Sequence, residues 1–219
     1  MTSEFTLVVG NRNYSSWSLR GFLAARAAGI AFDEVLIRLS EPGSKKELLK
    51  HSPAARVPVL KHGERTIWDS LAIVEYLAEI RPDAGLWPAD AAARAHARSI
   101  AAEMHAGFQA LRAHMPMNLR KSSPGKGRGR DVAEDIERIC AIWADCRARY
   151  GALGRFLFGR FTAADVMYTP VATRFRTYAV ELDEICQDYV DAVLARPDVR
   201  EWHEAALEEP WVIAEDEVA

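Results

Sequence analysis

The chain has 219 residues, of which 49% are hydrophobic and 27% charged, an ordinary globular composition for one large or two small domains. Its formal net charge of −3 gives no global reason to expect a nucleic-acid or membrane partner, and no apolar run approaches a membrane span in length. The first residues lack the basic start and apolar core of a secretion signal, so we expect a cytoplasmic protein.

The first 80 residues alternate strand and helix signals. Period-two apolar patterns and a His62-Gly63 turn predict strands, and apolar residues at helical spacing predict helices. The expected strands cover residues 5–9, 32–39, 57–60 and 66–68, and the expected helices cover residues 17–28, 44–51 and 70–79. The order βαβ, then a short helix, then ββα predicts a parallel strand pair extended by an antiparallel hairpin. This is the plan of a thioredoxin-like domain.

A Pro- and Gly-rich connection over residues 81–89 marks the expected domain boundary. Strand signals disappear after it, and five segments carry helical periodicity. They cover residues 90–115, 131–150, 162–178, 183–195 and 199–207. We therefore expect an α/β plus all-α protein, with a thioredoxin-like domain over residues 1–80 and an all-helical C-terminal bundle over residues 90–219.

Two features could indicate a phosphate-binding site or a metal site, but the sequence lacks the motifs that such sites need. The basic, Gly-rich segment 118–130 has no phosphate-binding motif, so we expect a mobile, solvated loop. Cys140, Cys146 and Cys186 form no C-x-x-C pair, and the six histidines show no ligand spacing. We expect structural thiols and no metal.

Three local features follow one another in the first 80 residues. They are NYSSWSLR at residues 13–20, ARVPVL at residues 55–60 and WDSLAIVEYL at residues 68–77. In this order, and followed by a helical domain, they resemble the glutathione site of the cytosolic glutathione transferase family. The serine-bearing turn is similar to that of the zeta class (maleylacetoacetate isomerase-like) and its bacterial relatives, whose pattern is Ser-Ser-Cys-Ser-Trp-Arg-Val-Arg. The classes that use a cysteine in this turn fit poorly.

The serine-bearing turn precedes a helix, whose N-terminus has unpaired N–H groups and a partial positive charge. A hydroxyl donor there would stabilise a bound thiolate and lower the thiol pKa from about 8.5. We favour Ser15 for this role, then Ser16, with Tyr14 as an alternative donor. Helix capping by one of these serines is the competing interpretation. Alignment on Trp17 and Arg20 without a gap would instead place Tyr14 at a leading serine of the class pattern.

The resemblance also implies how glutathione binds. A cis Val57-Pro58 bond would present the Val57 backbone to the cysteinyl residue of glutathione. Asp69 and Ser70, at a helix N-terminus, would hold the γ-glutamyl group. The cations available for the glycyl carboxylate are Arg56 and Lys45.

The second half carries two further matching elements. Thr162 and Asp165 are spaced as an N-capping box, with Phe161 and Val166 at the hydrophobic-staple positions. Arg174 stands where the zeta class has an arginine facing the substrate, although an interhelical salt bridge is an equal interpretation.

The second substrate is expected between the two domains. Six residues share one face of the expected helix 90–115, and they are Met104, His105, Phe108, Leu111, Arg112 and Met115. We expect His105, Phe108 and Arg112, together with Arg174, to contact this substrate.

The resemblance implies a homodimeric glutathione S-transferase that uses glutathione as co-substrate and joins its thiolate to a small electrophile. The alternative is glutathione-dependent cis–trans isomerisation of a maleyl compound such as maleylacetoacetate. A non-catalytic binding module is a third interpretation, and the intact Ser15-Ser16 turn argues against it.

Overall fold

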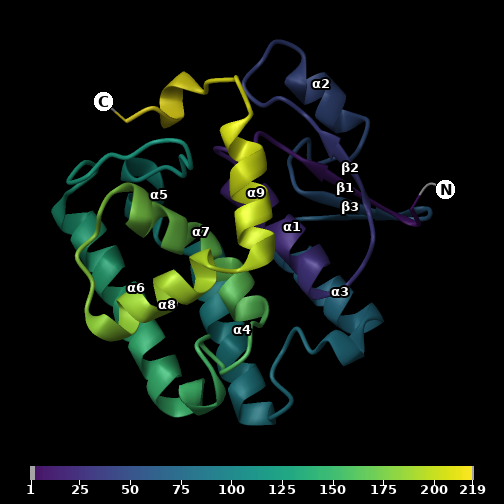
Figure 1. Cartoon of the computed structure of the whole chain (residues 1–219). Helices are drawn as coiled ribbons and strands as arrows, with labels where there is room; N and C mark the ends of the chain where they lie inside the picture. Colours follow the sequence, from purple (N-terminus) through teal and green to yellow (C-terminus); the bar gives the residue numbers. More distant parts are fainter. Residues whose placement is uncertain (1–2, 219) are drawn as a thin grey trace.

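The computed structural model describes residues 3–218 (Figure 1). Its first half contains four strands, β1 (Phe5–Val9), β2 (Asp33–Leu36), β3 (Val59–His62) and β4 (Arg65–Trp68), and three helices, α1 (Ser16–Ala27), α2 (Ser44–Leu49) and α3 (Ser70–Ile80). The second half is helical, with α4 (Ala91–Ala106), α5 (Gln109–His114), α6 (Arg130–Tyr150), α7 (Ala163–Thr177), α8 (Glu184–Leu194) and α9 (Pro197–Leu207). Short 3₁₀ turns lie at Pro82–Ala84, Gly151–Leu153 and Ala214–Asp216.

The four strands form one mixed sheet in the order β2-β1-β3-β4. β1 and β2 are parallel, with Leu7 opposite Glu34, whereas β3 pairs antiparallel with both β1 and β4. The predicted thioredoxin-like plan is therefore confirmed. Strand β2 is shorter than expected, although the Ile37 N–H still donates to the Val9 carbonyl at 2.8 Å.

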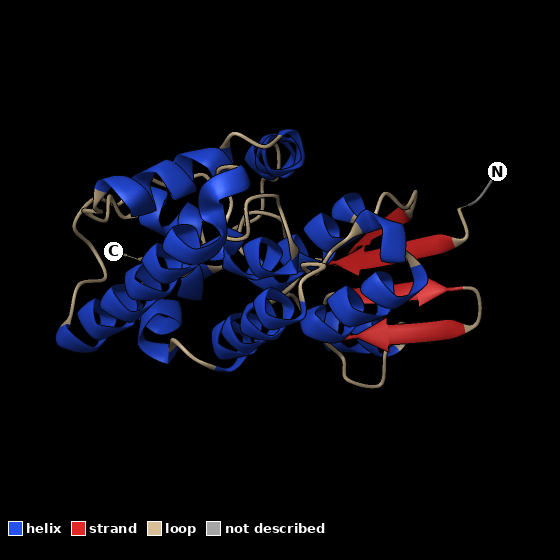
Figure 2. Cartoon of the chain, turned by 90° about the horizontal axis from the view of Figure 1, so that it is seen from below, coloured by secondary structure: helices blue, strands red, loops and turns tan. Residues whose placement is uncertain are grey.

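The two faces of the sheet follow the alternation of β1. Leu7 and Val9 belong to the main core with α1 and α3, whereas Val8 packs with Leu48 of α2 on the opposite face. Figure 2 shows the sheet at one end of the molecule and the helical bundle at the other. Helix α1 contacts β1 and α7, so it links the sheet to the bundle.

The bundle is built around α7, which is buried along almost its whole length. The predicted capping box starts this helix: Asp165 Oδ2 accepts from the Thr162 N–H at 2.7 Å and from the Thr162 hydroxyl at 2.9 Å. Asp165 Oδ1 also accepts from the Leu157 N–H at 3.1 Å. The box thus fixes both the helix start and the chain that leads into it.

The continuous helical face expected over residues 90–115 is wrong. Helix α4 ends at Ala106, Gly107 is extended, and Phe108 adopts a left-handed φ of 61° before α5 begins. Arg112 stabilises the break, because its guanidinium donates to the Gly107 carbonyl at 2.9 Å and to the Met104 carbonyl. A side chain thereby replaces the helical partners of these carbonyls.

The expected loop over residues 118–130 is present and mostly exposed, and two of its backbone N–H groups are hydrogen-bonded to the end of α7. The Ser123 N–H donates to the Thr177 carbonyl at 2.7 Å, and the Gly125 N–H donates to the Tyr178 carbonyl at 3.1 Å. Asn118 and Ser123 are buried. Pro116 and Met117, just before this segment, line the smaller cleft described below.

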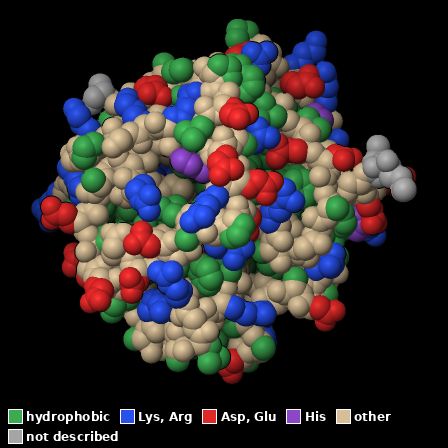
Figure 3. Space-filling view, viewed as in Figure 1, with side chains coloured by type: hydrophobic (Ala, Val, Ile, Leu, Met, Phe, Trp, Pro, Cys, Tyr) green, Lys and Arg blue, Asp and Glu red, His purple; other side chains and the backbone are tan. Residues whose placement is uncertain are grey.

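The surface in Figure 3 intersperses acidic and basic side chains over one face, as the small net charge predicts. None of the helices in the described part of the chain combines the length and apolar character needed to cross a membrane. The three cysteines are free thiols, and Cys146 and Cys186 are buried.

Candidate active site

The turn between β1 and α1 places Ser15 at the N-cap of α1. Its Oγ accepts from the Ser18 N–H at 3.2 Å and donates to Ser18 Oγ at 2.8 Å. Ser18 Oγ in turn accepts from the Gly10 N–H at 2.9 Å, which ties the cap to the end of β1. Ser15 therefore does cap the helix, as the competing interpretation proposed. The Ser15 hydroxyl proton is directed to Ser18 Oγ, so donation to a ligand requires the hydroxyl to rotate away from Ser18.

Two clefts meet at this turn. The larger has a volume of about 700 Å³ and the smaller about 280 Å³. Ser15, Trp17 and Leu39 line both of them. A group bound in the larger cleft near Ser15 is therefore adjacent to a molecule in the smaller one.

The larger cleft brings together most of the predicted glutathione-binding residues. Val57, Pro58, Asp69, Ser70 and Arg56 all line it, and the Val57-Pro58 peptide bond is cis. Ser70 is buried, yet its Oγ has no hydrogen-bond partner among the described residues. A buried hydroxyl without a partner costs free energy, so this atom is suited to a ligand in the cleft.

Asp69 is the N-cap of α3 and has a φ of 77°, a backbone conformation that few non-glycine residues adopt. Its Oδ1 accepts from the Leu71 N–H at 2.8 Å. Its Oδ2 lies 3.3 Å from Nε2 of His105 on α4. Burial lowers the pKa of His105, while the Asp69 carboxylate opposes that shift. A neutral imidazole that donates from Nε2 to the carboxylate accounts for the contact.

Two arginines line the smaller cleft. Arg112 and Arg174 line it beside Ser16, with Asp216 from the C-terminal segment. Arg174 is buried and donates to the Met115 carbonyl at 2.8 Å and to Ser16 Oγ at 3.4 Å. Burial, and secondarily the nearby Arg112, lower the pKa of Arg174 to about 10.

Arg174 forms no salt bridge with another residue of the described chain. Carboxylates are the usual partners of a buried guanidinium. The cleft therefore offers an incompletely neutralised positive charge to a second ligand.

The three candidate hydroxyls occupy different positions. Ser15 lines both clefts, whereas Ser16 and Tyr14 line only the smaller one. The Tyr14 hydroxyl donates to Glu217 Oε1 at 2.6 Å and accepts from Arg120 at 3.1 Å. Burial raises the pKa of Tyr14, with the Glu217 hydrogen bond as the next cause. The Tyr14 hydroxyl thus bonds the C-terminal segment, whereas Ser15 is the residue of the three that lines both clefts.

Two predicted site residues lie apart from the clefts. Lys45 is exposed on α2 and lines neither cleft. Phe108 is buried at the break between α4 and α5 and packs in the core. Of the predicted second-substrate residues, Arg112 and Arg174 line the smaller cleft, and His105 lines the larger one.

Sequence reasoning missed Trp17 and the C-terminal segment. Trp17 lies between the clefts, with the Arg20 guanidinium 4.7 Å and the Arg112 guanidinium 4.9 Å from its ring centre. Its place at the start of a helix beside Ser15 was a usable signal. Asp216 and Glu217 reach the site from the far end of the chain, and only their acidic cluster marked them.

Comparisons with known proteins place both halves of the chain in one family. A family model described as the N-terminal domain of glutathione S-transferase matches residues 14–80, and one described as its C-terminal domain matches residues 91–205. A maleylpyruvate isomerase from Ralstonia is 30% identical over 183 residues, covering 78% of this chain and 82% of the relative.

A probable maleylacetoacetate isomerase from Caenorhabditis elegans is 37% identical over 100 residues, 46% of either chain. The chain thus spans about half the length of the curated relatives it matches first. A glutathione transferase homologue from Burkholderia, solved with bound glutathione, has the same fold, with a TM-score of 0.69, 23% identity, and coverage of 94% of this chain and 98% of that one.

Proposed function

The chain belongs to the glutathione S-transferase family, and we propose that it is an enzyme that activates the glutathione thiol for attack on a small electrophile. The observation that carries this proposal is the position of Ser15. It lies at the start of α1, where the larger cleft meets the smaller one. A nucleophile held beside Ser15 is within reach of a molecule in the second cleft.

Glutathione would occupy the larger cleft. The Ser70 hydroxyl would meet the γ-glutamyl carboxylate, and Asp69 its ammonium group. The Val57 backbone N–H and C=O, which have no hydrogen-bond partner among the described residues, would pair with the cysteinyl residue. Arg56 lies in the same cleft for the glycyl carboxylate, and Lys45 would have to reach it from α2.

The thiolate would form at the start of α1. Loss of the thiol proton to solvent leaves an anion, which the Ser15 hydroxyl and the positive end of the helix stabilise. Both interactions favour the charged form and therefore lower the pKa of the bound thiol. The sulfur then attacks the electrophilic carbon, and a new carbon–sulfur bond forms as the leaving group departs or a double bond takes up a proton.

The second substrate would be anionic. Arg174 and Arg112 present positive charge in the smaller cleft, and carboxylates bind guanidinium groups through charge-assisted hydrogen bonds. This favours the isomerase reaction, in which the thiolate adds to a cis double bond, the resulting single bond rotates, and elimination restores both the trans double bond and glutathione. The relatives named maleylacetoacetate and maleylpyruvate isomerase support the same alternative.

Four expectations from the sequence analysis remain part of the proposal. They are a cytoplasmic location, a homodimer, a domain boundary at residues 81–89 and a reaction that needs no metal. Analytical ultracentrifugation of the purified chain tests the homodimer, since a single species at the monomer mass would overturn it.

Glutathione binding, measured by calorimetry and by thermal shift, tests the proposed function. We expect Ser70→Ala to weaken binding, because the ligand would lose its hydroxyl donor. Ser122→Ala is the matched control, since Ser122 is exposed on the loop between α5 and α6. A native chain that neither binds glutathione nor is stabilised by it would overturn the proposal.

A further inference from the structure

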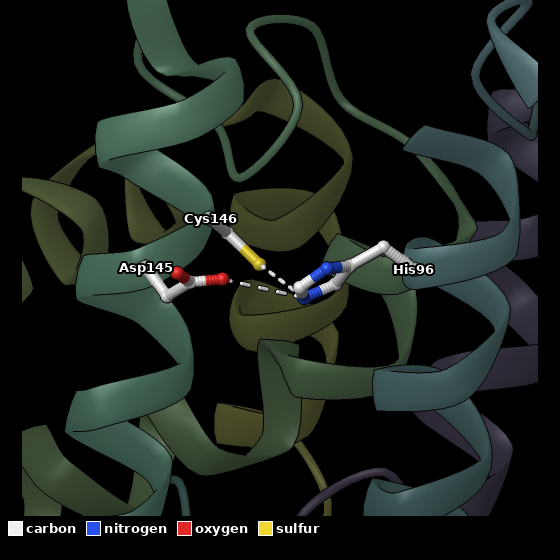
Figure 4. Close-up of side chains that lie close together, drawn as sticks. All are labelled: His96, Asp145 and Cys146. Atoms are coloured by element: carbon white, nitrogen blue, oxygen red, sulfur yellow. Dashed lines mark hydrogen bonds and ion pairs between the residues drawn. The ribbon is translucent and has the colours of Figure 1, made fainter. Parts of the chain in front are cut away.

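Three potential metal ligands converge in the helical half of the chain. His96 projects from α4, and Asp145 and Cys146 project from α6, with all three side chains directed toward one point (Figure 4). His96 Nε2 lies 3.7 Å from Cys146 Sγ and 3.6 Å from Asp145 Oδ2. The ligand atoms of the three residues all lie within 4.8 Å of one another.

These separations are close to those of a tetrahedral metal site. Zinc binds nitrogen and oxygen at about 2.0 Å and thiolate at about 2.3 Å, so tetrahedral angles place neighbouring ligand atoms roughly 3.3–3.6 Å apart. The two distances from His96 Nε2, 3.7 and 3.6 Å, exceed this range only slightly. The third pair, Cys146 Sγ and the Asp145 carboxylate, lies within 4.8 Å, so side-chain rotation must close that separation for all three atoms to reach one ion.

The surroundings suit a site at the edge of the bundle. Cys146 is buried, the His96 side chain is 22% exposed and the Asp145 side chain is 50% exposed. The rings of Tyr150 and Phe158 lie edge-on to the His96 imidazole, at 5.6 and 6.2 Å between ring centres, and hold its orientation. Because Asp145 faces solvent, a water molecule would complete the coordination as fourth ligand.

Arg149 competes with a metal at this place. Its Nη1 lies 3.0 Å from His96 Nδ1 and 3.2 Å from Asp145 Oδ2. A guanidinium that donates to Nδ1 leaves the imidazole proton on Nε2, whereas metal binding through Nε2 requires the proton on Nδ1. The Arg149 side chain is half-exposed, so it is free to swing into solvent when an ion binds.

We propose that His96, Asp145 and Cys146 form a transition-metal site of the zinc class that clamps α4 to α6. A mixed set of imidazole, thiolate and carboxylate favours Zn²⁺ and similar borderline ions over Mg²⁺ or Ca²⁺. Because the metal binds the thiolate form of Cys146, binding releases the thiol proton to solvent.

The site is separate from the glutathione cleft. His96 lies about 13 Å along α4 from His105, at the helical rise of 1.5 Å per residue. An ion here contacts neither cleft and acts on stability by linking two helices whose ligands are 50 residues apart in the sequence. That separation explains why the local spacing of the histidines gave no sign of it.

Cobalt titration of the full-length chain, treated with chelator and free of glutathione, tests the proposal. We expect one Co²⁺ per chain, with a thiolate-to-cobalt charge-transfer band, and a rise in Tm on adding Zn²⁺. Cys146→Ser and His96→Gln should each abolish the band, with circular dichroism to check that each variant keeps the fold. Cys140→Ser, on the same helix, is the control and should keep the band.

The variant Arg149→Ala distinguishes an ion bound at this site from an ion bound elsewhere on the surface. It removes a competing cation and the donor to His96 Nδ1, so we expect a several-fold lower dissociation constant for Co²⁺. An ion bound elsewhere on the surface would not respond to this substitution. The absence of a charge-transfer band at one equivalent of Co²⁺, or a band that persists in Cys146→Ser, would overturn the proposal.

Discussion

The imidazole of His105 on α4 contacts the carboxylate of Asp69 at the start of α3, with 3.3 Å between Nε2 and Oδ2. The contact joins the helical half to the thioredoxin-like half directly inside the larger cleft. The Asp69 carboxylate therefore has three roles. It contacts His105, caps α3 and faces the proposed γ-glutamyl site.

Two substitutions separate the role of Asp69 in capping α3 from its role in binding glutathione. Asparagine is a good N-cap, so Asp69→Asn should retain most of the stability while weakening glutathione binding through loss of charge. Asp69→Ala should weaken binding as well and also lower the free energy of unfolding by about 1 kcal/mol. Urea denaturation and calorimetry measure the two effects. Equal loss of stability in both variants would contradict the assignment of the cap.

His105 should make stability depend on pH. Burial lowers the pKa of His105 in the folded chain, so below its ordinary value of about 6.5 the unfolded state binds the proton more readily. The free energy of unfolding should therefore fall as the pH drops through that range, and the loss should level off below the folded pKa. His51 adds to the same trend, because burial also lowers its pKa.

The variant His105→Gln isolates the His105 contribution, since glutamine keeps a donor for Asp69 and does not titrate. Urea denaturation between pH 7 and 5 should show a shallower loss of stability than in the native chain. Superimposable curves for the two proteins would mean that His105 carries none of the effect.

The three hydroxyls of the turn should differ in their effect on catalysis. Ser15→Ala should lower kcat/KM by about 10²–10³-fold, the usual cost of removing one donor to a developing or stabilised anion. It should also raise the pKa of bound glutathione, followed by thiolate absorbance. Ser16→Ala should have a smaller effect, because Ser16 does not line the larger cleft. Our choice of Ser15 is wrong if Ser16→Ala alone abolishes the thiolate signal.

Arg174 should select for charge in the second substrate. Arg174→Gln should raise KM for maleylacetone by at least tenfold, because a charge-assisted hydrogen bond contributes about 1.5–3 kcal/mol. A neutral aromatic halide should be conjugated with nearly unchanged KM. Circular dichroism checks the fold, since Arg174 also donates to the Met115 carbonyl. Equal losses for both substrates would point to a structural role alone.

The sequence predicts well those interactions whose partners are close together in the chain. The caps at Asp69 and Thr162 lie within three residues of the groups they bond, so residue type and spacing identify them. The break at Phe108 was missed because Arg112 decides it, by binding carbonyls that a continuous helix would have used. The role of Glu217 was missed for a similar reason, since its partner Tyr14 lies at the other end of the chain.

The C-terminal segment should hold the smaller cleft in shape through Glu217. Its carboxylate accepts from Tyr14 at 2.6 Å, from Asn118 at 2.8 Å and from Lys121 at 3.2 Å, so it joins the start of α1 to the loop after α5 (Figure 1). Glu217→Ala leaves three donors without their acceptor and releases Asp216 from the cleft that it lines with Arg174.

We expect Glu217→Ala to change KM for the second substrate while leaving the dissociation constant of glutathione within twofold, because Glu217 does not line the larger cleft. Tyr14→Phe removes one of the same hydrogen bonds and should shift KM in the same direction by a smaller factor. Glu215→Ala is the control, since the neighbouring Glu215 is exposed and makes no side-chain hydrogen bond among the described residues. Steady-state kinetics with each substrate varied in turn measure the split. A loss of glutathione affinity equal to the change in KM would show that the segment supports the whole site and not the second cleft alone.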